Sequence, residues 1–367
     1  MKMSKVMIVG NSIDGFFSFR KELAAELKER GYDVILVFPD GSRTEYFAEQ
    51  GFQMIRVEME RHGVNPLQEL ALLNAFRRVI KREKPDVVLT YTIKPNIYAG
   101  LACRMLGVPY IANITGLGTA VECGGWLQKI TLPLYRMGLR KAGMVFFQNA
   151  ENQRFMLEKR AVNGEHALLP GSGVNLEQYQ LSDYPDEGTV DFVFVGRLMK
   201  QKGIDQYLEA AQAIRSEYPQ TRFHVCGAME ESYEERIAEL EKRNVIIYHG
   251  VVRDMNGMYK KMSCTVHPTY YPEGLSNVLL ESCASGRAII TTDRAGCREV
   301  VDDGVNGYVV KQQDSQDLIR KIKQFLALTP EEQRQMGLNG RAKVEKEFDR
   351  RIVIDQYLRA IERIQRT

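Results

Sequence analysis

The fold is decided by residues 5–39, which read KVMIVGNSIDGFFSFRKELAAELKERGYDVILVFP. A short apolar strand pattern at 5–10 leads into a polar loop, a helix-period stretch at 16–30, a glycine, and the apolar run that begins at Asp33. This order is a βαβ unit, whose helix returns the chain so that the two strands lie parallel in one sheet. The chain is therefore expected to begin with an α/β domain.

The same alternation recurs along the chain in two series. Further strands are expected at 87–90, 109–113 and 143–147, and then at 190–197, 223–227, 245–248, 264–267 and 288–292. Helices are expected at 65–84, 96–106, 205–216, 233–242, from 277 onward, and in the tail at 329–347 and 350–366. Strands and helices that alternate in this way predict doubly wound parallel sheets of the Rossmann-like kind.

Two interruptions, at 168–173 and 181–188, separate the two series. The length of 367 residues also suits two domains of ordinary size. We expect an N-terminal domain at 1–170, a C-terminal domain at 171–348, and a final helix at 349–367 that packs outside the second domain.

Composition narrows the class of protein. Hydrophobic residues make up 44% and charged residues 26%, as in soluble globular domains, which excludes a disordered or collagen-like chain. A net charge of +3 does not favour nucleic acid as a partner. No apolar run is long enough to cross a bilayer, and the N-terminal run is too short for a signal peptide, so a cytoplasmic location is expected.

The cysteines and histidines show no metal-site spacing. We expect reduced, buried thiols and mostly structural histidines, because no Cys-x-x-Cys pair and no histidine cluster is present. An Asp-x-Asp pair, which would hold a divalent metal on a nucleotide diphosphate, is also missing. The sequence therefore predicts neither a metal nor a cofactor.

Two basic clusters lie in the N-terminal half, at 77–84 and 125–141. The second contains Trp126, and its Lys129, Arg136 and Arg140 share one helical face. Basic amphipathic segments with Trp and Leu bind anionic membrane surfaces. The alternative is an ordinary amphipathic helix with a solvated face, and the two readings remain open.

Ligands of open α/β sheets bind at the carboxyl ends of the strands, so the loops there are the candidate sites. In the loop 196–203, Arg197 and Lys202 stand beside glycines and could bind phosphate oxygens, although a solvated basic turn is the alternative. In the segment 267–281, a helix starting near Ser276 and Asn277 offers the backbone amides of an anion site. Glu273 precedes that helix, and Glu281 lies inside it, where its carboxylate could reach diol hydroxyls.

Two loops of the first domain are weaker candidates. The loop 10–15 contains Gly10, Asn11, Ser12, Asp14 and Gly15. It is not a Walker loop, because phenylalanines follow where Lys and Ser or Thr are required. The loop 113–120 exposes backbone amides through glycines and contains Thr115 and Gly116. In both cases a plain glycine-rich connection remains the alternative.

In combination these loops resemble glycosyltransferase family 4, a retaining family with the GT-B fold of two Rossmann-like domains facing a cleft. The resemblance rests on Gly196-Arg197-Leu198 with Lys202-Gly203, and on Glu273-Gly274 with Glu281, which reproduce the family's two motifs. Segments 90–96 (TYTIKPN) and 115–118 (TGLG) are similar to the subgroup that builds bacterial capsule, O-antigen and lipid-linked oligosaccharides.

The resemblance implies roles for these residues. Arg197 and Lys202 would neutralise the donor diphosphate, Glu281 would hold the ribose hydroxyls, and Glu273 would contact the donor sugar. The amides of Leu275, Ser276 and Asn277 would bind the phosphates together with the adjacent Gly196 and Gly274, and the loop 10–15 would lie beside the leaving phosphate or the acceptor. Many members have a histidine after the strand that here ends at 113–115, and this chain has none there.

The implied activity is metal-independent, retaining transfer of a hexose onto a polyprenyl-diphosphate-linked saccharide, with UDP-N-acetylhexosamine as the expected donor. The final helix would cross back to the first domain, and the protein would lie peripherally on the cytosolic face of the inner membrane. Two alternatives remain. One is a UDP-sugar epimerase or hydrolase on the same fold, and the other is a non-catalytic scaffold that binds a nucleotide sugar or a membrane.

Overall fold

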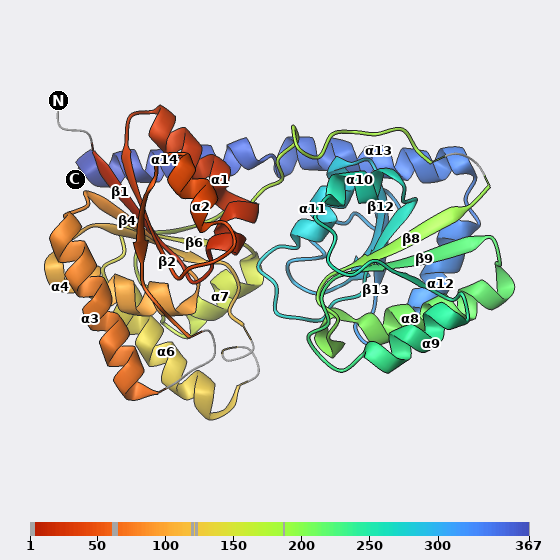
Figure 1. Cartoon of the computed structure of the whole chain (residues 1–367), viewed down its shortest axis with the longest axis horizontal. Coiled ribbons are helices and arrows are strands. Elements are labelled where there is room, and N and C mark those ends of the chain that lie inside the picture. The colour runs from red at the N-terminus through yellow and green to blue at the C-terminus, as the bar shows by residue number, and fades with distance from the viewer. Residues whose placement is uncertain (1–3, 61–64, 119–120, 122–123, 186–187, 367) are drawn as a thin grey trace. The chain divides into compact units, whose positions relative to one another are not determined.

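The structure is a computed structural model that describes residues 4–60, 65–118, 121, 124–185 and 188–366. The chain divides into two compact units (Figure 1). Unit 1 comprises Met1–Ser172 and Arg351–Thr367, and unit 2 comprises Gly173–Arg350. The last helix thus belongs to unit 1, although unit 2 precedes it in the chain.

Unit 1 contains a parallel seven-stranded sheet in the order β3-β2-β1-β4-β5-β6-β7. Its strands are β1 (Lys5–Val9), β2 (Asp33–Phe38), β3 (Gln53–Arg56), β4 (Val87–Tyr91), β5 (Tyr110–Ile114), β6 (Met144–Phe147) and β7 (His166–Leu168). The register pairs Ile8 with Leu36 on one side and with Leu89 on the other. The inner strands are buried and mostly apolar because helices cover both faces of the sheet, whereas the edge strands β3 and β7 are partly exposed.

Helices cover both faces of this sheet. The described helices are α1 (Ile13–Glu29), α2 (Thr44–Glu49), α3 (Pro66–Glu83), the π-helical turn η1 (Pro95–Ala99), α4 (Gly100–Leu106), α6 (Gly125–Leu139), α7 (Ala150–Glu158) and α14 (Arg350–Arg366). Residues of α1 and α14 pack with one face of the sheet, and residues of α3 and α4 pack with the other. Next to α4 lies α6, so α3, α4 and α6 form one layer (Figure 1).

Unit 2 contains a parallel six-stranded sheet in the order β10-β9-β8-β11-β12-β13. Its strands are β8 (Val190–Val195), β9 (Thr221–Cys226), β10 (Ile247–Tyr248), β11 (Cys264–His267), β12 (Ala288–Thr292) and β13 (Gly307–Val310). Its helices are η2 (Lys200–Lys202), α8 (Ile204–Glu217), α9 (Glu234–Lys242), α10 (Met255–Lys260), α11 (Asn277–Ala284), α12 (Ser315–Leu326) and α13 (Pro330–Glu347). Two fully apolar clusters fill the two faces of the sheet.

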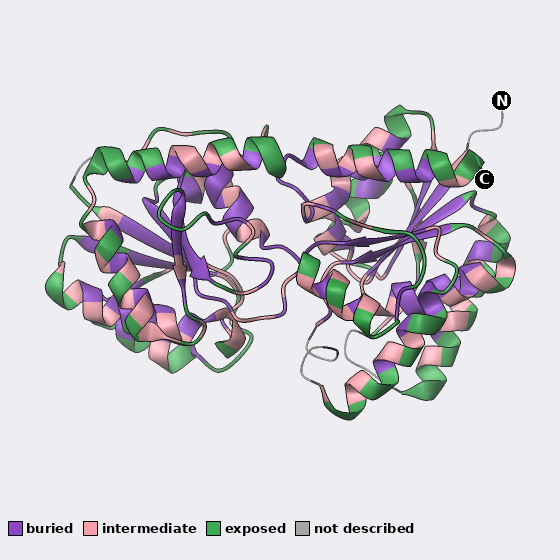
Figure 2. Cartoon of the chain, turned by 180° about the vertical axis from the view of Figure 1, so that it is seen from behind, coloured by how far each residue is buried: buried purple, intermediate pink, exposed green. Residues whose placement is uncertain are grey.

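Burial follows this layered plan in both units. In Figure 2 most of the strands are buried, and the helices alternate buried inner residues with exposed outer ones. Local signals set the helix ends: the Asn65 side chain accepts a hydrogen bond from the Leu67 N–H at the start of α3, and Thr329 and Glu332 form a capping box at α13.

The expected α/β architecture of two doubly wound sheets is confirmed, and several elements differ in detail. The sequence analysis missed β3, β7, β13, α2, α7, α10 and α12, most of which are short or partly exposed and therefore carry little periodic signal. The strand expected at 245–248 contains only Ile247–Tyr248, and the helix expected at 96–106 begins as the π-helical turn η1. A π-turn has no sequence signature of its own, because local packing produces it.

Both sheets have the same kind of topological switch point. In the sheet of unit 1 the chain order reverses between β1 and β4, and in the sheet of unit 2 it reverses between β8 and β11. Connections on the two sides of such a point run to opposite faces, which opens a crevice at the carboxyl ends of the strands. These two edges are therefore where ligands are expected.

Candidate functional site

The switch point of the sheet in unit 2 brings together two loops that the sequence analysis identified. Neighbouring strands β8 and β11 end there, and the loops 196–203 and 268–276 follow them. Gly203 has a φ of 78°, and a Cβ at this position would lie 2.1 Å from the carbonyl oxygen of Pro268. Gly196, which opens the first loop, has a φ of 154°. Glycine is required at Gly203 for the loops to approach this closely, and at Gly196 because of its backbone angle.

Four side chains from these loops form one cluster that contains two cations. Lys202 makes an ion pair with Glu273, and both side chains are largely shielded, with exposures of 12% and 18%. The Tyr271 ring lies 4.9 Å from the Lys202 Nζ and 5.5 Å from the Arg197 Cζ. Arg197 is more open and donates to the Glu230 carboxylate at 2.8 Å. Both predicted cations therefore lie within cation–π distance of one aromatic ring.

The start of α11 adds backbone donors beside this cluster. Ser276 is the N-cap residue, but its side chain makes no capping hydrogen bond. No partner among the described residues accepts from the N–H of Leu275 or Asn277. The Ser276 N–H donates instead to the carbonyl of Gly296 at 2.7 Å, and Gly296 also lies close to Gly274. In this structure the Ser276 amide is thus engaged within the fold, and its predicted role in phosphate binding stays a prediction.

Glu281 lies one turn inside α11 with a half-buried side chain. Burial raises the pKa of its carboxyl group to about 7, which the positive charge of Arg350 and hydrogen bonds from Tyr179 and Tyr259 oppose. The Tyr259 hydroxyl is 3.4 Å from the Glu281 Oε2. An ionised carboxylate there accepts hydrogen bonds from neighbouring hydroxyls, which suits a diol.

The loop 10–15 of unit 1 is shorter than expected. Helix α1 already begins at Ile13, so Gly15 lies inside the helix, and the loop contains only Gly10, Asn11 and Ser12. The Ser12 side chain accepts from the Gly15 N–H at 3.1 Å as an N-cap. Asp14 accepts from the Ser42 hydroxyl at 2.8 Å. Ser12 and Asp14 thus have structural partners, and the roles predicted for this segment stay predictions.

Thr115 and Gly116 follow β5, and Gly116 has a φ of 141°. The strand before them is fixed by a buried hydrogen-bond network that also involves the TYTIKPN segment. Thr90 donates to the Asn96 Oδ1 at 2.7 Å, and Asn96 donates to the Asn113 carbonyl at 2.8 Å. The polar residues of this segment therefore position β5 and the loop that follows it.

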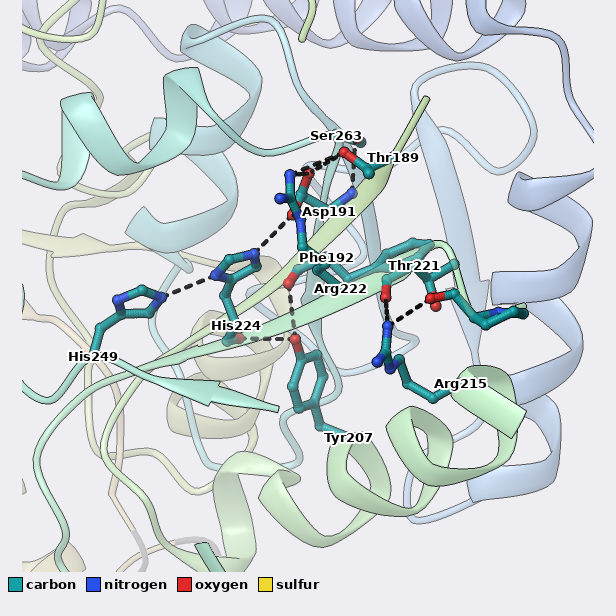
Figure 3. Close-up of polar contacts among 11 residues, drawn as sticks. Thr189, Asp191, Phe192, Tyr207, Arg215, Thr221, Arg222, His224, His249 and Ser263 are labelled. Atoms are coloured by element: carbon teal, nitrogen blue, oxygen red, sulfur yellow. Dashed lines mark hydrogen bonds and ion pairs between the residues drawn. The ribbon is translucent and has the colours of Figure 1, made fainter. Parts of the chain in front are cut away.

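The histidines have structural surroundings. His224 contacts Asp191 at 2.8 Å and His249 at 2.9 Å, and Arg222 also donates to Asp191 (Figure 3). Burial of Asp191 raises its pKa, but hydrogen bonds from His224 and Arg222 more than offset this and hold the pKa below its usual value. Burial beside Lys202 lowers the pKa of His267 to about 3, so this imidazole is neutral.

The described cysteines are free and buried, at positions 103, 226, 264, 283 and 297. Cys123 and His62 lie outside the described residues. Within the part of the chain that the structure describes, no group of three His, Cys, Asp or Glu side chains could hold a metal ion. None of the described helices is long and apolar enough to cross a membrane.

The switch point of unit 2 therefore combines two cations, unpartnered helix amides and a carboxylate. Cations and amides together bind phosphate groups, and the carboxylate binds hydroxyls, which are the parts of a nucleotide diphosphate. Sequence reasoning missed the tyrosines at 179, 259 and 271. Each tyrosine contacts a site residue that is distant in the sequence, so no local pattern predicts the contact. Only a position in or near the motif loops could have suggested a role.

Comparison with known proteins supports this assignment of fold and class. The family model described as "Glycosyl transferases group 1" matches residues 182–343, and "Glycosyl transferase 4-like" matches residues 5–149. The chain is 23% identical over 365 residues to an N,N'-diacetylbacillosaminyl-diphospho-undecaprenol alpha-1,3-N-acetylgalactosaminyltransferase of Campylobacter jejuni, covering 95% of this chain and 96% of that protein. It is 24% identical to the capsular polysaccharide biosynthesis glycosyltransferase CapM of Staphylococcus aureus, covering 90% of each.

A solved structure shows the same fold. The Anabaena protein Alr3699/HepE in complex with UDP superimposes with a TM-score of 0.80 at 16% sequence identity, over 98% of this chain and 99% of that one. The two family matches together span most of the chain, and each covers most of one sheet. The chain belongs to glycosyltransferase family 4 and has the GT-B fold.

Proposed function

We propose that the protein transfers a sugar, with retention of anomeric configuration, from a UDP-sugar to a polyprenyl-diphosphate-linked saccharide in the assembly of a bacterial surface polysaccharide. The observation that carries this proposal is the grouping of Arg197, Lys202, the α11 amides and Glu281 at one switch point. The acceptor class is supported by the Campylobacter relative, whose name specifies an undecaprenol diphosphate. N-acetylhexosamine is the proposed sugar.

In this mechanism unit 2 binds the donor and unit 1 binds the acceptor. Arg197 and Lys202 stabilise the negative charge that develops on the leaving diphosphate, which is the largest electrostatic contribution expected. Lys202 exchanges its contact with Glu273 for one with phosphate, and Glu273 then faces the donor sugar. The leaving phosphate itself assists the acceptor hydroxyl, so no covalent nucleophile and no metal ion or cofactor is needed.

The first prediction concerns the reaction itself. With UDP-N-acetylglucosamine or UDP-N-acetylgalactosamine and a polyprenyl-diphosphate saccharide, we expect an α-linked product that forms at the same rate with EDTA present. Mass spectrometry would detect the product, and proton NMR coupling constants would give its anomeric configuration. A β-linked product would refute retention, and loss of activity with EDTA would refute metal independence.

The same assay separates the alternatives. A UDP-sugar epimerase or hydrolase would convert the donor when no acceptor is present, whereas the proposed transferase consumes donor only with acceptor. A non-catalytic scaffold would bind UDP and produce nothing with any acceptor. Thermal shifts with UDP, GDP and ADP give the base independently, and we expect UDP to stabilise the protein most.

We also propose that unit 1 binds the cytosolic face of the inner membrane through the layer formed by α3, α4 and α6. Large apolar side chains are exposed on this layer: Trp126, Ile130 and Met137 on α6, Met105 on α4, and Leu67 and Leu70 on α3. The exposed Lys129 and Arg140 flank the α6 residues. Arg136 is different, because its guanidinium donates to the carbonyls of Lys159 and Arg160. Exposed apolar groups with basic neighbours suit an anionic bilayer.

The second prediction tests this surface with vesicles. Replacing Lys129 and Arg140 with Gln is expected to weaken binding to phosphatidylglycerol vesicles by about thirtyfold, since each basic residue near an anionic surface contributes about 1 kcal/mol. Sedimentation with the vesicles measures the binding. Arg253→Gln, an exposed arginine of unit 2, is the control and should have no effect. Equal binding by all three proteins would exclude this surface.

A further inference from the structure

Unit 1 contains a buried arginine with no carboxylate partner. Arg20 lies in α1 with 9% of its surface exposed, and its guanidinium Cζ is 4.5 Å from the centre of the Tyr91 ring. Among the described residues no acidic group forms an ion pair with it, and no hydrogen bond of its guanidinium reaches a carboxylate. Burying a charged group costs free energy unless an opposite charge lies beside it. The position of Arg20 therefore favours binding of an anion.

The groups around Arg20 are neutral and partly unsatisfied. The Tyr91 hydroxyl is buried and has no hydrogen-bond partner among the described residues. Tyr357 donates its hydroxyl to the Asn113 Oδ1 at 2.5 Å. Burial raises the pKa of Tyr357, and the positive charge of Arg20 opposes that shift. The Arg20 side chain is not fully enclosed, because 9% of its surface remains exposed.

This group lies at the switch point of the sheet in unit 1. Tyr91 is the last residue of β4, and α1 follows β1, so the cluster is at the edge where the order of strands reverses. Side chains of a helix point toward its N-terminus, which directs the Arg20 guanidinium to the carboxyl ends of the strands. The next residue, Thr92, has a φ of 72° and a buried hydroxyl without a partner among the described residues. Such a backbone conformation is strained in a β-branched residue and is concentrated at binding sites.

We propose that Arg20 and the Tyr91 hydroxyl bind a phosphate group of the acceptor's diphosphate. A guanidinium binds phosphate oxygens through two parallel hydrogen bonds, and a phenol hydroxyl donates a third. The anion supplies the counter-charge that the position lacks. This inference rests on the proposed function only for the source of the diphosphate. The acceptor is the source we propose, because Arg197 and Lys202 are already assigned to the donor diphosphate.

The first test needs no activity. It uses protein carrying Arg197→Ala and Lys202→Ala, so that inorganic pyrophosphate cannot bind through the donor cations. In this background pyrophosphate is expected to raise the melting temperature, and adding Arg20→Gln should weaken its affinity by at least about tenfold. Arg154→Gln, an exposed arginine of α7, is the matched control and should leave the affinity unchanged. Equal affinity in the Arg20→Gln and Arg154→Gln proteins would overturn the proposal.

The second test identifies the source of the diphosphate. In otherwise wild-type protein, Arg20→Gln and Tyr91→Phe should raise the KM for a short-chain prenyl-diphosphate saccharide, by at least about tenfold for Arg20→Gln, and leave the donor KM unchanged. With an alkyl glycoside acceptor that lacks the diphosphate, the variants should match the wild type. A rise in the donor KM instead would overturn the assignment to the acceptor. If the wild type transfers no sugar at all, the proposed function fails, while the pyrophosphate test still decides whether Arg20 binds an anion.

Discussion

Replacing Arg197 with alanine is expected to lower kcat by about a hundred- to a thousandfold, the loss typical of removing one preorganised donor to a developing charge. Its partner in the structure is Glu230, in an ion pair whose side chains are 41% and 47% exposed. An exposed pair of this kind contributes little to folding. The variant should therefore fold with an unchanged melting temperature, which makes the kinetic loss interpretable.

Steady-state kinetics with saturating acceptor would measure this loss, and Arg253→Ala provides the control, because Arg253 is exposed in the same unit. Arg197→Lys should recover part of the rate, since it restores the charge without the planar pair of donors. If Arg197→Ala keeps more than about a third of the wild-type kcat, the diphosphate is not bound where we propose.

Lys202 should behave differently from Arg197, although both are assigned to the same diphosphate. Its ion pair with Glu273 is shielded, so Lys202→Ala removes a cation that contacts a largely buried carboxylate. Removing one partner of a shielded pair costs stability as well as activity. The two substitutions should also be non-additive in kcat, because Arg197 and Lys202 act on one group and share the Tyr271 ring.

Part of the fold and of the candidate site could be predicted from the sequence alone. The alternation of strands and helices was sufficient to predict two doubly wound sheets, because each buried strand is a continuous apolar run between helical repeats. The loops 196–203 and 267–281 were identified as candidate sites because each follows a strand pattern, and the structure places Arg197, Lys202 and Glu273 near one another. The strand and helix patterns are local signals, which the residues carry wherever the rest of the chain lies.

The remaining features depend on contacts between distant segments. The Ser276 amide is engaged by Gly296, twenty residues away, and no local pattern indicates that contact. Tyr179 and Tyr259 reach Glu281 from other parts of unit 2. In the sequence, Arg20 is indistinguishable from the other charged residues of an amphipathic helix. Its burial against the Tyr91 ring is seen only in the structure.

Replacing Glu281 with glutamine is expected to stabilise the folded protein at pH 8 while it weakens binding of the donor. Burial raises the pKa of this carboxyl group from 4.5 to about 7, so the folded protein holds a proton that the unfolded chain releases between these values. Stability therefore falls as the pH rises from about 4.5 to about 7, and it stays lower above that range. Glutamine does not titrate and avoids this loss.

The stabilisation is on the order of 1–2 kcal/mol at pH 8, after allowance for solvent that reaches the half-buried carboxyl, which corresponds to about 3–5 °C in melting temperature. At pH 4 both proteins carry a neutral side chain, and the difference should vanish. Calorimetry or thermal melts across pH 4–8 would measure it. Glu235→Gln, an exposed position on α9, should show no pH-dependent difference from the wild type.

Glu281→Gln should weaken donor binding at pH 8 although it stabilises the fold. Opposite effects on binding and on stability distinguish a residue that contacts the ligand from one with a purely structural role. The ionised carboxylate accepts hydrogen bonds from two ribose hydroxyls, so its loss should raise the Kd for UDP by about ten- to a hundredfold at pH 8. In the wild type the Kd should rise as the pH falls below about 7, and in Glu281→Gln it should be flat. A variant that is more stable at pH 8 and binds UDP normally would show that Glu281 is merely a buried acid of the core, and the ribose would have to be bound elsewhere.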